Sequence, residues 1–296
     1  MSLGAGELRR LMAEHGVQPS RALGQHFVAD PNTVRRIVRL AGIDAGSRVV
    51  EVGAGLGSLT LALAAAAGAA GDVVAIEVDR FLVPVLRSVV EGCANVRVVE
   101  ADALTLRWQE LLDGARLEDE VVASDDGRRR NWSLVANLPY NVATPLVVRV
   151  LEEAPQVTSM LVMVQREVGE RLAAAPGGRE YGAVSVKVAY WSRAAVVGTV
   201  PPTVFVPQPA VESALVRITR RAEPAVPSAA PYDRLFALVR AGFSQRRKML
   251  RRSLAGVVTP DAFAAADIDP SARAEQLSVE EWGRLAAVGC EGSVAG

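Results

Sequence analysis

Residues 48–57 read Arg-Val-Val-Glu-Val-Gly-Ala-Gly-Leu-Gly and run directly into the apolar segment 58–67. The β-branched residues of 48–52 predict a buried strand, and segment 58–67 predicts a helix. The three glycines between them predict a loop whose backbone can come close to a ligand. A strand, a glycine loop and a helix in this order form the nucleotide-binding entry of a doubly wound sheet. The stretch therefore predicts a Rossmann-like α/β fold.

The rest of the chain alternates between strand-like and helix-like segments, which favours a mostly parallel sheet. Residues 18–30 have no clear period, so we expect a loop or arm there. Further strands are expected at 72–77, 96–99, 134–136, 159–164, 184–191, 194–200 and 212–219. Further helices are expected at 6–15, 32–41, 80–91, 144–153 and 167–174, the second of them started by Asp30 and Pro31.

Changes in composition along the chain predict four parts. We expect an N-terminal arm with helices over 1–45 and a Rossmann-like domain over 46–222. A linker rich in proline and alanine follows over 223–231, and a small all-helical domain over 232–296. The charged, aperiodic stretch 113–131 is expected to be a surface insertion.

The composition excludes several classes of protein. The 296 residues have a formal net charge of zero and are 50% hydrophobic, which disfavours disorder and a globally basic surface. Cys93 and Cys290 have no neighbours at metal-ligand spacing, so we expect neither a metal site nor a disulfide framework. The N-terminus lacks an apolar secretory core, and the apolar run 59–70 is too short to span a bilayer. We expect a soluble cytoplasmic protein without membrane contact.

Polar residues follow the ends of successive predicted strands. Glu51 precedes the loop of Gly53 and Gly55, Glu77 ends the next strand, and Asp102 with Ala103 follows the third. Ligands of an open α/β sheet bind at this edge. Glu77 is expected to bind both hydroxyls of a ribose, and Asp102 with Ala103 an adenine amino group and ring nitrogen.

The loop distinguishes between two cofactors. NAD sites usually carry G-x-G-x-x-G, but Ser58 stands where the last glycine would be. The carboxylate of Glu51 suits a cationic, amino-acid-bearing ligand better than a pyrophosphate. S-adenosyl-L-methionine is therefore the expected cofactor, and an NAD oxidoreductase is the disfavoured alternative.

A fourth strand end carries Asn137-Leu138-Pro139-Tyr140. Pro139 fixes its own φ and favours an extended Leu138, so the carbonyls here point in defined directions. The Asn137 amide oxygen and the Leu138 carbonyl can accept the two protons of an exocyclic amine, and Tyr140 can stack on its ring. The alternative is an ordinary corner between a strand and a turn.

Taken together, the motifs resemble those of the ribosomal RNA adenine dimethyltransferase family, over roughly residues 19–282. The matching stretches are 24–30, 51–57, 76–79, 102–103, 137–141, 144–145, 164–167, 202–207 and 243–250. The resemblance implies a class I S-adenosylmethionine-dependent methyltransferase domain with a small helical C-terminal domain. It also implies cofactor contacts at His26, Val28, Gly53, Glu77, Asp102 and Asn137. The chain departs from the family pattern at His26, usually Asn, and at Ala54, usually Pro.

The expected reaction is in-line attack of an adenine N6 amine on the sulfonium methyl, with Asn137 and Leu138 accepting the amine protons. The resemblance adds Phe205 as a second stacking ring, although a core aromatic residue explains Phe205 equally well. The target adenine must be unpaired or flipped out of its stack.

Residues 240–252 carry six basic residues and no acid. Phe236, Val239, Phe243, Leu250 and Leu254 fall at helical spacing, which predicts one helix with a packed face and a cationic face. We expect Arg240, Arg246, Arg247, Lys248 and Arg251 to contact RNA phosphates. The alternative is a solvated helix face.

The resemblance implies, as the expected function, dimethylation of two adjacent adenosines in the 3′-terminal hairpin of 16S rRNA. The substrate would be a 30S precursor during ribosome biogenesis, and the enzyme a monomer. One alternative is a large-subunit rRNA methylase of the macrolide-resistance type. Another is a non-catalytic RNA-binding factor, against which the intact Glu77, Asp102 and Asn137 argue.

Overall fold

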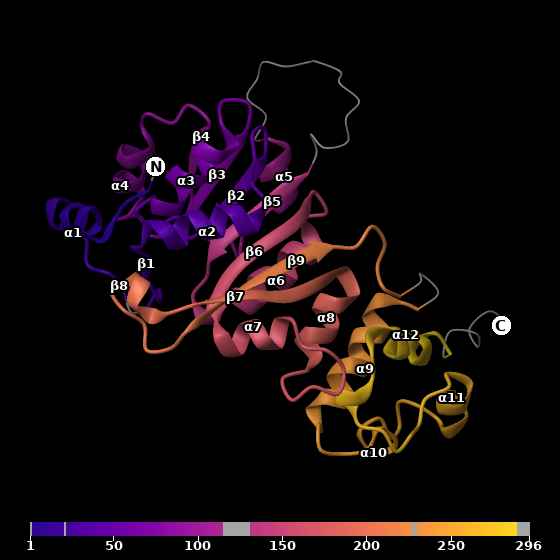
Figure 1. Ribbon diagram of the computed structural model, residues 1–296. Helices are drawn as coiled ribbons and strands as arrows, with labels where there is room; N and C mark the ends of the chain where they lie inside the picture. Colours follow the sequence, from indigo (N-terminus) through magenta and orange to yellow (C-terminus); the bar gives the residue numbers. More distant parts are fainter. Residues whose placement is uncertain (1, 21, 115–130, 227–229, 289–296) are drawn as a thin grey trace. The chain divides into compact units, whose positions relative to one another are not determined.

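The computed structural model describes residues 2–20, 22–114, 131–226 and 230–288. Its main sheet has seven strands in the order β4-β3-β2-β5-β6-β9-β7 (Figure 1). Strands β2 to β6 run parallel, and β9 is antiparallel to β6. The Rossmann-like α/β fold is thereby confirmed. The strands are β2 (Arg48–Val52), β3 (Asp72–Glu77), β4 (Val96–Glu100), β5 (Trp132–Asn137), β6 (Val157–Gln165), β7 (Ser192–Val200) and β9 (Ser213–Arg220).

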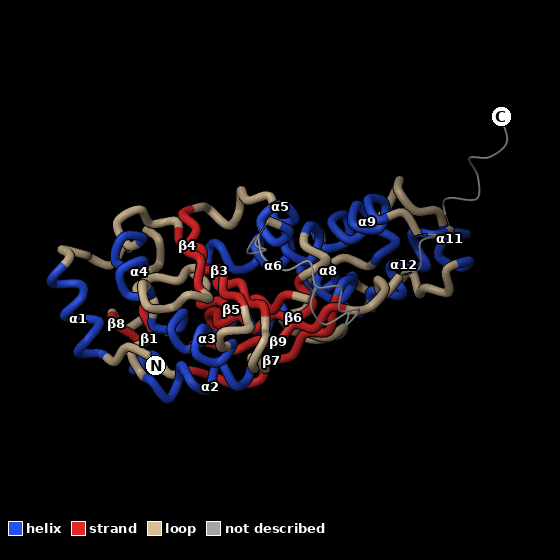
Figure 2. Tube along the Cα trace, turned by 90° about the horizontal axis from the view of Figure 1, so that it is seen from above, coloured by secondary structure: helices blue, strands red, loops and turns tan. Residues whose placement is uncertain are grey.

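Helices cover the sheet on both sides. In Figure 2, α2 and α3 lie below the strands and α5 lies above them. The side of α2 and α3 is held by a buried cluster that includes Val34, Leu63, Val49 and Val135. The helices of this part are α1 (Ala5–Glu14), α2 (Pro31–Ala41), α3 (Ser58–Ala67), α4 (Val83–Val90), α5 (Trp108–Asp113), α6 (Tyr140–Glu153) and α7 (Arg166–Leu172).

The start of α2 is as the sequence predicts. The Asp30 carboxylate accepts hydrogen bonds from the amides of Asn32 and Thr33, and Pro31 fills the first helical position. Gly42, with a φ of 68°, ends the helix in a left-handed conformation.

One of these local predictions was wrong, and another gained a short strand. Residues 184–191, expected as a strand, form helix α8 (Ala183–Trp191). Their alternating valines suggested a period of two, but helical packing of Val186 and Tyr190 into a core overrides that preference. The expected arm at 18–30 contains the short strand β1 (Phe27–Val28), which pairs antiparallel with β8 (Phe205–Val206).

The contacts of the chain divide it into two compact units. The first holds residues up to 169 together with 195–220, and the second holds 170–194 and 221 onward. The expected helical domain at 232–296 thus shares its unit with α8, since residues of α8 belong to the same core. The insertion at 115–130, the centre of the linker at 227–229 and the end of the chain at 289–296 lie outside the described residues.

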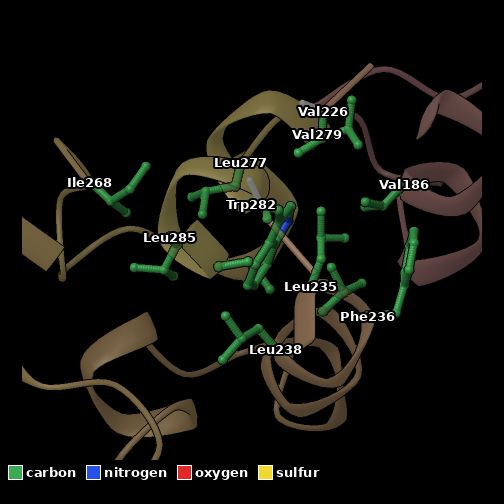
Figure 3. Packing of buried hydrophobic residues seen from close by; sticks show 14 of the residues in the cluster. Val186, Val226, Leu235, Phe236, Leu238, Ile268, Leu277, Val279, Trp282 and Leu285 are labelled. Carbon is green, nitrogen blue, oxygen red and sulfur yellow. The ribbon is translucent and has the colours of Figure 1, made fainter. Parts of the chain in front are cut away.

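Trp282 is at the centre of the second unit. It belongs to α12 (Val279–Ala287), is fully buried, and lies among Leu235, Leu238 and Leu285 (Figure 3). Gly242 of α9 makes room for the ring, because a Cβ there would lie 2.6 Å from a Trp282 ring carbon. Besides α8 and α12, the helices of this unit are α9 (Tyr232–Ser244), α10 (Leu250–Ser253) and α11 (Pro260–Ala265). Short 3-10 helices lie at Ala274–Gln276 in this unit and at Pro202–Val204 in the first.

In the described parts of the chain, no helix is both long and apolar enough to cross a bilayer. Nor do the described residues contain a group of three or more His, Cys, Asp or Glu side chains arranged to hold a metal ion.

Candidate active site

A cavity of about 460 Å³ opens at the carboxyl ends of β2, β3 and β5 in the first unit. Eleven residues that the sequence analysis singled out line this one cavity. They are His26, Val28, Glu51, Gly53, Gly55, Glu77, Asp102, Ala103, Asn137, Leu138 and Phe205. Tyr140 begins α6, and its side chain lies outside what the structure describes.

The glycine loop brings main chain to the cavity. The amides of Gly53 and Ala54 both donate to the Ile76 carbonyl, at 2.9 and 3.1 Å. Gly55 has a φ of 57°, and a Cβ there would lie 3.0 Å from the Phe27 ring. A side chain at this position would therefore meet both strain and a neighbour.

Glu77 is held by the backbone around it. One carboxylate oxygen accepts from the Gly55 amide at 2.7 Å, and the other accepts from the amides of Val78 and Asp79 at 3.0 Å each. The side chain is 5% exposed. Burial raises the pKa of Glu77, while these three hydrogen bonds lower it. The carboxylate is fixed in place and retains acceptor capacity for a ligand hydroxyl.

Glu51 has a different environment. Its side chain is 2% exposed, and one oxygen accepts a hydrogen bond from the Thr60 hydroxyl at 2.6 Å. Burial raises the pKa of Glu51 from 4.5 to about 8, against the lowering effect of Thr60 and with a further increase from nearby Glu77. A cation in the cavity would favour the ionised form of this group.

The Asn137 side chain is oriented by the N-terminal arm. Its Nδ2 donates to the main-chain carbonyl of His26 at 2.8 Å, which leaves Oδ1 as an acceptor. The Leu138 amide donates to the Met163 carbonyl at 2.9 Å, which fixes the adjoining peptide. The arm thus leaves Asn137 Oδ1 as an acceptor, and the sheet fixes the peptide between Asn137 and Leu138.

His26 also ties the arm to a second loop. Its Nδ1 lies 2.7 Å from the Pro207 carbonyl, and since a carbonyl only accepts, Nδ1 carries the proton. Phe205 of β8 is the strand partner of Val28 of β1. Phe205 is 4% exposed and packs in a hydrophobic cluster, yet it also lines the cavity. Its position therefore fits both a stacking ring at the cavity and an aromatic residue of the core.

Leu8 and Gln25 are among the cavity residues that the sequence analysis did not predict. Leu8 of α1 is fully buried against Phe27 and Leu56 and forms part of the wall. Gln25 donates from Nε2 to an Asp79 oxygen at 2.8 Å, which links the arm to the loop after β3. The helical spacing of Leu8, Leu11 and Met12 was a signal of packing, although not of what α1 packs against.

The predicted single basic helix is wrong. α9 ends at Ser244, and α10 begins only at Leu250. The helix breaks because Leu250 and Arg251 donate their amides to the carbonyls of Ala272 and Pro270, far along the chain. The apolar residues of this stretch still pack in the core of the second unit.

The break changes which basic side chains are available to contact RNA. Arg246 pairs with Glu275 at 2.5 Å and also donates to the Arg179 carbonyl. Hydrogen bonds from Ser271 lower the pKa of Asp269, and the charge of Arg251 adds to this lowering. Among the described residues 240–252, the exposed basic side chains that show no hydrogen bond, ion pair or charge interaction with another described residue are Arg240, Arg247, Lys248 and Arg252.

Comparison with known proteins finds rRNA methyltransferases. Residues 17–288 match the family described as Ribosomal RNA adenine dimethylase. A relative from Bifidobacterium longum, "Ribosomal RNA small subunit methyltransferase A", is 43% identical over 96% of this chain and 92% of its own. A relative of the same name from Kineococcus radiotolerans is 45% identical over 96% and 91%. The crystal structure of the 23S rRNA methyltransferase ErmE is 26% identical, covers 88% of this chain and 98% of its own, and has a TM-score of 0.65.

Proposed function

The chain belongs to the ribosomal RNA adenine dimethylase family, and from this membership we propose that it dimethylates two adjacent adenosines in the 3′-terminal hairpin of small-subunit rRNA. The observation that carries the proposal is the 43–45% identity, over nearly the whole chain, to proteins named as small-subunit methyltransferases. A large-subunit target is not favoured, because the 23S rRNA methyltransferase is only 26% identical. A non-catalytic factor is not favoured either, since the cavity retains Glu51, Glu77 and Asn137.

The donor set of the cavity fits S-adenosylmethionine. Glu51 offers a buried carboxylate to a cationic group, and Glu77 offers acceptors to the ribose. Asp102 Oδ1 accepts a hydrogen bond from the Leu104 amide at 2.8 Å. The second carboxylate oxygen is available to the adenine amino group. Gly55 lines the cavity without a side chain, and a Cβ there would meet the Phe27 ring. When bound, this cofactor supplies a methyl group on a cationic sulfur.

The chain's own residues act on the RNA base. Asn137 Oδ1 and the Leu138 carbonyl accept the two protons of the adenine N6 amine and direct its lone pair into the cavity. The His26 carbonyl prevents Asn137 from turning its Nδ2 towards the amine. Holding reactants in this way can contribute up to roughly 7–11 kcal/mol. Since an adenine in a helix cannot reach the cavity, the target is unpaired or flipped.

The finer parts of the proposal concern the partner. We propose that the substrate is an assembling 30S particle, that the enzyme acts as a monomer, and that it works in the cytoplasm. Exposed Arg240, Arg247 and Lys248 contact phosphates and make RNA binding dependent on salt.

The test is transfer of a tritiated methyl group from S-adenosylmethionine to small subunits that lack the modification, followed by nucleoside analysis. We expect dimethyladenosine in the small-subunit RNA. Label confined to large-subunit RNA would support the macrolide-resistance alternative. RNA binding without transfer to either subunit would support the non-catalytic one.

A further inference from the structure

Thr60 lies directly behind an acidic residue of the cofactor cavity. It occupies the third position of α3, is fully buried, and donates its hydroxyl to Glu51 Oε2 at 2.6 Å. Glu51, one residue before the end of β2, is the member of the pair that lines the cavity. Any effect of Thr60 on a ligand must therefore pass through Glu51.

The surroundings of Glu51 disfavour its charge. The residues beside it in the sheet are Ala75 of β3 and Val135 of β5, both fully buried and apolar. Among the described residues, the charged group that acts on Glu51 is Glu77, a second acid. Burial raises the pKa of Glu51 to about 8, and the Thr60 hydrogen bond is the one contribution that lowers it. Without a cation nearby, these surroundings favour the protonated form of Glu51.

We propose that Thr60 is a positioning residue, whose hydroxyl orients Glu51 and favours the ionised form that receives the cationic end of S-adenosylmethionine. The inference rests on the proposed function, since it needs that cofactor in the cavity. A hydroxyl that donates to a carboxyl group stabilises the charged form more than the neutral form. Thr60 therefore shifts the balance of Glu51 towards the form that binds a cation.

The test measures cofactor affinity by calorimetry between about pH 6 and pH 9. In the natural protein, affinity should rise with pH as Glu51 ionises more easily. Thr60→Val should weaken binding by roughly tenfold or more at pH 7, because it removes a hydrogen bond to a charged group. It should also move the rise in affinity to higher pH. Thr60→Ser keeps the hydroxyl and should restore both the affinity at pH 7 and the pH at which affinity rises.

Thr33 provides a matched control. Its hydroxyl donates to Asp30 Oδ2, also at 2.6 Å, at the start of α2 and away from the lining of the cavity. Thr33→Val should lower stability but leave the pH dependence of cofactor binding unchanged. The amine of the cofactor titrates in a similar range, but equally for every variant, so differences between variants report on the protein.

The outcomes separate two failures. If Thr60→Val weakens binding by the same factor at every pH, or leaves it unchanged, or if Thr60→Ser does not restore it, Thr60 has only a structural role. If the natural protein does not bind S-adenosylmethionine at any pH, the proposed function fails and the inference fails with it.

Discussion

The Asn137 side chain donates to the main-chain carbonyl of His26 at 2.8 Å, across a separation of 111 residues. The strand end that carries the amide and the arm that orients it are thus distant in the sequence. Since the contact uses the backbone of residue 26, it does not depend on the side chain there, and His in place of the family's usual Asn is compatible with it.

Asn137→Ala removes the Oδ1 acceptor from the cavity. We expect methyl transfer to fall by about 10²–10³-fold, by analogy with the loss of one donor from an oxyanion site. RNA affinity should remain close to normal, because the amide acts on the amine and not on the phosphates. Single-turnover methylation and filter binding measure the two effects. Near-normal turnover in a folded Asn137→Ala protein would contradict the proposed role.

Glu51 should make the stability of the ligand-free protein depend on pH. Its pKa is raised from 4.5 in the unfolded chain to about 8 in the folded protein, so the folded state binds the proton more tightly. The resulting stabilisation is fully present below pH 4.5 and is lost as pH rises towards 8. Glu51→Gln should not show this loss, which amounts to about 5 kcal/mol at most.

Denaturant unfolding of ligand-free protein at pH 5 and pH 8 measures this difference. Glu91→Gln, on an exposed residue, serves as a control and should behave as the natural protein does. Identical pH profiles for Glu51→Gln and the natural protein would show that Glu51 has an ordinary pKa.

The exposed basic side chains should account for part of the salt dependence of RNA binding. Replacing Arg240, Arg247 and Lys248 by Gln should lower the slope of log affinity against log salt by about two to three. Arg246→Gln is the matched control, because Arg246 already pairs with Glu275 and should change the slope less. An unchanged slope in the triple variant would mean that this surface is only solvated.

Gly242→Ala should destabilise the second unit. The added Cβ would lie 2.6 Å from a ring carbon of Trp282 and 3.3 Å from the Ala274 Cβ, in a fully packed core. We expect a loss of about 1–3 kcal/mol from this overpacking. Gly6→Ala is the control, since Gly6 is also helical but has open space around it, and it should be neutral or stabilising. Thermal unfolding of both variants provides the comparison.

Much of the site can be predicted from the sequence because its parts are local. Each strand end is followed at once by its polar residue, as with Glu77 and Asn137, and parallel strands bring these ends to one edge. The rest depends on contacts between distant segments. The break after Ser244 depends on carbonyls of Ala272 and Pro270, and no local pattern at 245–249 contains that information.

Contacts between distant segments also explain the other differences between the predicted and the observed structure. The strand β1 has only two residues, so its pairing with β8 leaves no periodic signal. The alternating valines of α8 favoured a strand until the core that receives Val186 was known. Leu8 could be recognised as a packing residue, but only the fold shows that α1 closes one wall of the cavity.

The pairing of Phe27 and Val28 with Phe205 and Val206 has a consequence during synthesis. A chain emerging from the ribosome presents the glycine loop early, but the wall of its cavity also needs the β8 strand and residues as late as Ser213, so it is incomplete until these have left the exit tunnel. An incomplete nascent chain therefore cannot form the finished methylation site.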